Sequence, residues 1–168
     1  MKVKLSWTAF PLLLAFLLVV PQSLAQDDDG GFGSNVAGAW LGSGTFSVDL
    51  GCDGIIDIPN IPFTDAHNFG VGGSRVTTNP LNPNSNHGTW VKTGPRQVTG
   101  RDINFSADAS NVGLITIVVD FDKRLETATT RFEGKFYSIS QDPLDPIEVP
   151  WGCSIGEHTS FRKVSAIE

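Results

Sequence analysis

The chain has 168 residues, with 18 Asp and Glu against 12 Lys and Arg and a formal net charge of −6. A chain of this sign repels nucleic-acid phosphates and anionic lipid headgroups, so neither is expected as a partner. Eighteen glycines and ten prolines beside a single methionine favour turns and strands over helices.

The first 25 residues have the pattern of a secretory signal peptide. Lys2 and Lys4 precede an apolar run over residues 5–20, and Ser23-Leu24-Ala25 places small side chains before a cleavage site. The run is shorter than the roughly 20 residues of a membrane-spanning helix. We therefore expect cleavage near Ala25 and a mature chain that is secreted, either periplasmic or extracellular, and not inserted in a membrane. An uncleaved membrane anchor is the alternative.

The mature chain is long enough for one domain, which we expect over residues 36–165 as a monomer or weak oligomer. Residues 26–35 are rich in Asp and Gly and are expected to be flexible.

The first extended run begins at Gly38-Ala39-Trp40. Apolar residues and glycines share one parity from Trp40 to Val48, whereas Ser43, Thr45 and Ser47 share the other. This alternation predicts a half-buried strand, in which the glycines suit tight curvature.

Further strands are predicted over residues 69–77, 88–93, 97–107, 112–121, 126–140 and 154–164, separated by Asn-Pro, Gly-Pro and Asp-Pro turns. Between residues 52 and 67, Pro59 and Pro62 leave either a short edge strand at 55–58 or a packed loop. No segment shows a helical period. Seven or eight strands with short connections predict an all-β fold, a single up-and-down antiparallel barrel, with a two-sheet sandwich as the alternative.

Cys52 and Cys153 are the only cysteines, and an oxidising compartment favours a disulfide between them. Closure of an up-and-down barrel pairs the first strand with the last, so that the end of one lies beside the start of the other. Cys52 follows the first predicted strand and Cys153 precedes the last, so closure brings them together. Two unpaired buried thiols are the alternative, and two sulfurs without a nearby histidine pair do not make a zinc site.

Three histidines, His67, His87 and His158, lie in separate segments. Convergence of the three with Asp65 would make a metal site, but their spacing forms no metal motif, and exposed or loop-anchoring histidines are the preferred interpretation. No metal or organic cofactor is expected.

Other motifs predict no metal, phosphate or catalytic site. Asp49, Asp53 and Asp57 surround Gly54 but lack the spacing of a calcium loop, so acidic turns explain them better. The glycines of residues 70–73 precede no helix and are no phosphate loop, and there is no Gly-x-Ser-x-Gly elbow.

Aromatic side chains are the remaining candidates for binding. They either fill a small barrel or line an open cavity with apolar walls. The residues expected to contact a ligand are Trp90, Phe105, Phe121, Phe132 and Phe136.

Gly38-Ala39-Trp40 on the first strand, with Arg162 near the end of the last, resembles the lipocalin and wider calycin arrangement. The resemblance implies that Trp40 is buried at the barrel floor with Arg162 packed across its ring, close to the Cys52–Cys153 bridge. His87-Gly88-Thr89-Trp90 and Gly94-Pro95-Arg96 look like small exported barrel proteins of unassigned role, mostly bacterial. A second resemblance is to the barrel of dirigent proteins and allene oxide cyclases.

Together these features predict a secreted protein that binds a small, largely apolar ligand. The alternatives are an isomerase or cyclase that uses His67, His87 or Asp65 at the rim, and a structural or inhibitory surface protein with a packed interior. A cluster of histidine and carboxylate in a cavity would favour the enzyme, an apolar cavity the binding protein, and no cavity the third.

Overall fold

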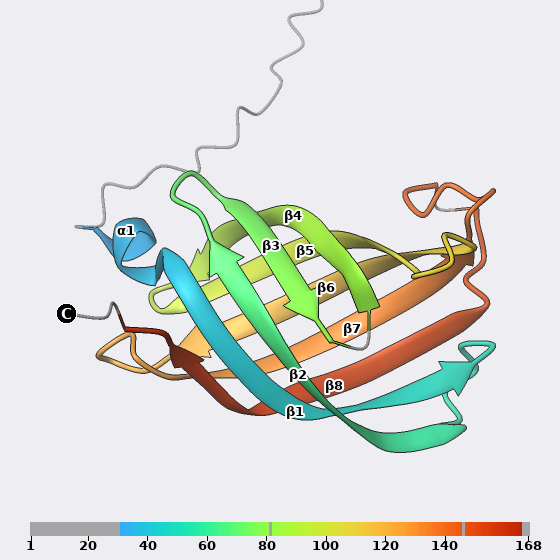
Figure 1. Cartoon of the computed structure of the whole chain (residues 1–168), viewed down its shortest axis with the longest axis horizontal. Helices are drawn as coiled ribbons and strands as arrows, with labels where there is room; N and C mark the ends of the chain where they lie inside the picture. Colours follow the sequence, from blue (N-terminus) through green and yellow to red (C-terminus); the bar gives the residue numbers. More distant parts are fainter. Residues whose placement is uncertain (1–30, 81, 146, 166–168) are drawn as a thin grey trace, which may run out of the picture.

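The computed structural model describes residues 31–80, 82–145 and 147–165 (Figure 1). The elements are α1 (Phe32–Val36), β1 (Gly38–Leu50), β2 (Ile58–Phe69), β3 (Ser74–Asn79), β4 (Asn82–Gly94), β5 (Gln97–Phe105), β6 (Asn111–Phe121), β7 (Ala128–Ser138) and β8 (Gly152–Lys163). The predicted signal peptide lies outside the described residues. Within them, no helix has the length and apolarity needed to cross a bilayer.

The strands form one closed antiparallel barrel in sequence order, from β1 to β8. β1 closes the sheet by pairing with β8 from Trp40↔Lys163 to Leu50↔Gly152. This closure leaves no open edge on β1 or β8 and excludes the two-sheet sandwich. The predicted all-β, up-and-down barrel is confirmed.

β2 is the strand that the sequence did not predict over its full length. Pro59 and Pro62 lie in the part of β2 that pairs with β1, whereas β3 pairs with β2 only over Ala66–Phe69. The prolines are therefore in a stretch with one free side, where a missing N–H costs no ladder hydrogen bond. The predicted strand over residues 69–77 instead contains the turn between β2 and β3.

α1 covers one end of the barrel, beside the start of β1 and the end of β8 (Figure 1). Phe32 and Val36 on this helix are buried in the core, so the end of the segment predicted to be flexible, residues 32–35, forms a helix that packs on the barrel. Trp40 is fully buried below them, and its indole N–H donates to the Val36 carbonyl oxygen over 2.9 Å. We call this end the closed end; its core consists of Phe32, Val36, Trp40, Phe69, Trp90, Val98, Ile117, Val119, Phe121 and Phe161, of which Ile117 also faces the interior above.

Arg162 does not pack on Trp40. Arg162 pairs with Leu41 and is exposed on the outer face, whereas Lys163 pairs with Trp40 and holds its ammonium 6.0 Å from the indole centroid. Because side chains alternate along a strand, a shift of one residue moves a side chain to the other face. The predicted cation at the closed end is therefore present, but Lys163 supplies it.

The disulfide between Cys52 and Cys153 is formed, with Cα atoms 5.2 Å apart. Cys52 lies in the loop after β1 and Cys153 near the start of β8, so the bridge lies at the end of the barrel opposite α1. Trp40 lies at the other end of β1. The prediction that the disulfide lies close to Trp40 is therefore wrong. We call the bridged end the mouth; its described loop residues are 51–57, 80, 106–110, 139–145 and 147–151.

Candidate functional site

A cavity of about 550 Å³ extends from the middle of the barrel to the mouth. Cavities of this size hold small molecules in other proteins. The core of the closed end shuts it below, since His67 on its lower wall packs against Phe69 and Phe161.

The wall of the cavity is apolar on one side and polar on the other. The apolar side is built by β6, β7, β1 and β2, with Phe46, Val48, Phe63, Ile115, Ile117, Phe132 and Phe136. The polar side is built mainly by β3, β4 and β5, with Thr77, Asn79, Asn82, Asn86 and Asn104. The accessible lining of the cavity is mostly apolar, as the sequence predicted, and its polar groups are gathered on one side.

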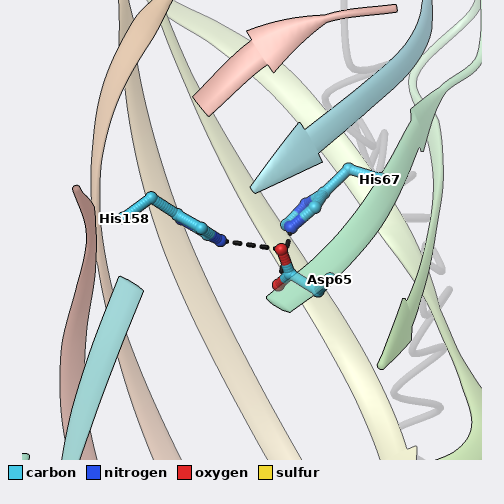
Figure 2. Close-up of side chains that lie close together, drawn as sticks. All are labelled: Asp65, His67 and His158. Atoms are coloured by element: carbon cyan, nitrogen blue, oxygen red, sulfur yellow. Dashed lines mark hydrogen bonds and ion pairs between the residues drawn. The ribbon is translucent and has the colours of Figure 1, made fainter. Parts of the chain in front are cut away.

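Asp65 and two histidines converge at the bottom of the cavity, as Figure 2 shows. Nε2 of His158 lies 2.8 Å from Oδ1 of Asp65, and Nε2 of His67 lies 2.8 Å from Oδ2. All three side chains are buried. Thus two of the three histidines meet beside Asp65, whereas His87 is exposed on the outside of β4.

Hydrogen bonding makes Asp65 a strong acid. Burial alone would raise its pKa, but the hydrogen bond to His158 and the contact with His67 outweigh burial and hold the pKa well below its usual value. The carboxylate is therefore ionised at neutral pH and acts only as an acceptor. Since an acceptor faces Nε2 of His158, that nitrogen carries hydrogen.

Arg75 fixes the tautomer of His67. Nη2 of Arg75 lies 2.6 Å from Nδ1 of His67, and a guanidinium can only donate hydrogen bonds. Nδ1 is therefore the acceptor, and Nε2 of the neutral ring carries the hydrogen. Burial is the main reason that the pKa of His67 falls to about 4, with Arg75 adding to it and Asp65 opposing it.

The network continues to both sides of this cluster. Arg75 forms an ion pair with Asp102, whose Oδ2 also accepts a hydrogen bond from Thr77 over 3.3 Å. Burial raises the pKa of Asp102 against the opposing effect of Arg75. On the other side, the Thr130 hydroxyl contacts Nδ1 of His158. One chain of polar contacts thus crosses the barrel from β7 to β5.

Asp65, His67 and His158 are also the described residues that could hold a metal ion, with ligand atoms within 4.8 Å of one another. Two histidines and one carboxylate form a common site for divalent iron. A ligating histidine, however, presents a lone pair and donates its other N–H to an acceptor. Arg75 offers a donor at Nδ1 of His67 instead, so this cluster fits a hydrogen-bond network and not a metal.

Two strand glycines provide the space that the network occupies. A Cβ on Gly42 would lie 2.5 Å from both Asp65 Oδ1 and His158 Nε2. A Cβ on Gly88 would lie 2.0 Å from the Arg101 carbonyl oxygen and 2.4 Å from Asp102 Oδ1. A larger residue at either position would therefore displace a polar group of the network, and at Gly88 it would also meet the neighbouring backbone.

The predicted ligand-contacting residues divide into three groups. Phe132 and Phe136 line the cavity. Trp90 and Phe121 belong to the core of the closed end, and Phe105 is exposed at 46%. The prediction therefore placed two of five residues on the cavity wall, because sequence parity does not tell how high in the barrel a side chain lies.

Sequence reasoning missed the polar side of the cavity. Arg75, Thr77 and Asn79 share one parity on β3, and Asp65 and His67 share one on β2. Polar residues repeating at the buried parity of a strand are the signal that could have revealed this wall.

Asp49, near the end of β1, stabilises the turn that follows the strand. Its carboxylate accepts hydrogen bonds from the backbone N–H groups of Asp53 and Gly54, at 3.2 and 2.8 Å. The predicted acidic turn therefore accounts for the carboxylate of Asp49.

Comparison with known proteins finds no match: no family model, no curated protein and no solved structure matches this chain. The class that the structure defines is a closed eight-stranded antiparallel barrel with an internal cavity. Several unrelated families share this architecture, so the fold does not distinguish lipocalins from other barrels.

Proposed function

We propose that the protein binds a small molecule inside the barrel, as an exported carrier or receptor without a metal or organic cofactor. The cavity carries this proposal: it holds about 550 Å³, it reaches the mouth, and the core of the closed end shuts it below. A protein with only a structural or inhibitory surface has no need for such a space.

The buried network supports binding over a structural role. Arg75 and Asp102 are both nearly inaccessible, at 3% and 1% exposure. A buried ion pair adds little stability, because the loss of hydration offsets the attraction between the charges. An apolar bottom would hold the barrel at least as well, so we attribute these groups to the recognition of a ligand.

An acid–base enzyme is the second candidate, favoured by the convergence of His67 and His158 on Asp65. Neutral His67 can polarise a carbonyl oxygen through Nε2–H. A base is harder to find, because Asp65 has a lowered pKa and Arg75 occupies the lone pair of His67. Binding without turnover therefore fits the network better.

Export is part of the proposal. The signal-peptide pattern of residues 1–25 and the disulfide are both compatible with an oxidising compartment. Kinship with lipocalins stays a prediction based on Gly38-Ala39-Trp40.

Native mass spectrometry of the protein purified from its own host tests the proposal. We expect a small molecule that stays with the protein and departs on denaturation. Val48→Trp places an indole in the cavity and should lower occupancy about tenfold or more. Val91→Trp, on the exposed face of β4, is the matched control and should bind as the wild type does. Equal occupancy in both variants would exclude the cavity as the site.

A further inference from the structure

We infer that the ligand is a two-faced molecule without a negative charge: an apolar ring system on one face and hydroxyl or carbonyl groups along the opposite edge. This inference rests on the proposed function and names the chemistry of the ligand. Three features of the cavity carry it: an aromatic half, an uncharged polar half, and a bottom with unpaired donors and acceptors.

The apolar half is dominated by rings. Phe63 meets Phe46 at 5.9 Å and Phe132 at 5.5 Å between ring centroids, in edge-to-face contacts. Nearer the mouth, Phe136 lies 5.9 Å from Trp151. Such rings give a broad surface of low conformational entropy, which suits a flat or cyclic partner better than a flexible chain.

The polar half consists of amides and hydroxyls. Asn82 donates to Oδ1 of Asn104 over 2.8 Å, which orients both side chains. The half-buried side chain of Asn86 has no hydrogen-bond partner among the described residues, although it lines the cavity. A carboxamide left with both a donor and an acceptor matches a hydroxyl or carbonyl of a ligand.

At the bottom, three buried polar atoms lack a directed hydrogen bond within the described chain: Nε2 of His67, Nε of Arg75 and Oδ1 of Asp102. Nε2 of His67 lies close to Asp65, but its N–H does not point at the carboxylate. An unpaired buried donor or acceptor costs about 1–3 kcal/mol, so these atoms call for a partner. Two donors and one acceptor match a hydroxyl group, which can accept and donate at once.

Charge disfavours an anion. Asp102 neutralises Arg75 and Asp65 is ionised, so the described residues at the cavity bottom offer no free cation. The mouth loops contain no Lys or Arg but six acidic residues: Asp53, Asp57, Asp108, Asp142, Asp145 and Glu148. A carboxylate ligand would therefore cross a repulsive entrance to reach a site without a counter-ion, which disfavours fatty acids.

A matched series of fluorescent probes tests the inference on the full mature protein. Pyrene, 1-pyrenemethanol and 1-pyrenecarboxylate share one ring system and differ in polarity and charge. We expect 1-pyrenemethanol to bind about tenfold more tightly than pyrene, and 1-pyrenecarboxylate to bind more weakly than both. Tighter binding of 1-pyrenecarboxylate than of 1-pyrenemethanol would overturn the inference.

Substitutions in the polar wall make the test specific. Asn86→Leu should remove the preference for 1-pyrenemethanol over pyrene, and Asn86→Leu with Asn104→Leu should reverse it. Asn68→Leu, on the exposed face of β2, should keep the wild-type preference. If pyrene binds and the Asn86→Leu ratio equals that of the wild type, the inference fails and the binding function stands. If no uncharged probe binds the wild type, the proposed function itself fails.

Discussion

His67 is held by two neighbours with opposite electrostatic effects. Asp65 favours the imidazolium, whereas burial and the guanidinium of Arg75 favour the neutral ring and prevail. The neutral ring is what places a hydrogen on Nε2 at the bottom of the cavity. The same contact with Arg75 that argues against a metal thus creates the donor that we assign to ligand recognition.

His67 should make the barrel sensitive to mild acid. Its folded pKa of about 4 lies below the unfolded value of 6.5, so between these pH values the unfolded chain binds a proton that the folded chain does not. The free energy of unfolding should therefore fall as pH drops through this window, by roughly 2 kcal/mol between pH 7 and 4.5. Asp65, whose pKa is lowered, adds to the loss only below about pH 4.

Urea unfolding at several pH values measures this effect. His67→Gln retains an amide that can donate to Asp65 and accept from Arg75, but it cannot titrate, so its stability should change less between pH 7 and 4.5. His87→Gln, at an exposed position, should keep the full dependence of the wild type. An undiminished pH dependence in His67→Gln would show that another group is responsible.

At the scale of strands, β8 shows that side-chain alternation alone does not tell which residues face the core. The pairing register with the neighbouring strand decides it. The sequence places Arg162 and Lys163 at successive positions, and either could carry the cation near Trp40. The pairing Trp40↔Lys163 shows that Lys163 supplies the cation. Its ammonium also donates a hydrogen bond to the carbonyl oxygen of Asn35 in α1. β8 thereby ties the helix to the closed end.

The two cations should differ in their contribution to stability. Lys163→Ala removes a cation–π contact and the hydrogen bond to Asn35, and should lower the free energy of unfolding by about 1–2 kcal/mol. Arg162→Ala, at an exposed position, should change it by less than about 0.5 kcal/mol. Urea titrations measure the free energy of unfolding of the two variants. A larger loss of stability in Arg162→Ala than in Lys163→Ala would contradict the pairing of Trp40 with Lys163.

The strands that the sequence predicts are those with clear alternation and turn residues on both sides, such as β6 and β7. β2 could not be predicted over its full length, because its prolines are acceptable only where β3 does not pair with it, and that is a property of the sheet. α1 could not be predicted because five residues are too few to show a helical period. The cluster of Asp65, His67 and His158 could not be predicted because His158 and Asp65 are 93 positions apart and meet only when the barrel closes.

At the scale of the whole molecule, the pairing of β1 with β8 completes the wall around the cavity. β1 connects the two ends of the barrel, with Trp40 in the closed core and Cys52 just beyond the mouth. Stability from aromatic packing is concentrated at one end, and the space for a ligand at the other. The covalent bond lies at the open end, where packing holds the strands least.

The Cys52–Cys153 bridge should therefore matter for the barrel as a whole. It closes a loop of 101 positions, and in the chain-entropy model this corresponds to about 4–5 kcal/mol of stabilisation. Cys52→Ala with Cys153→Ala should lower the urea midpoint, and it should increase the denaturant slope, because an unlinked unfolded chain exposes more surface. Reduced wild-type protein is the matched control and should follow the double variant. The closed end should persist, with the indole emission of Trp40 unchanged before the transition. A midpoint and slope equal to those of the oxidised protein would show that pairing of β1 with β8 alone holds the mouth together.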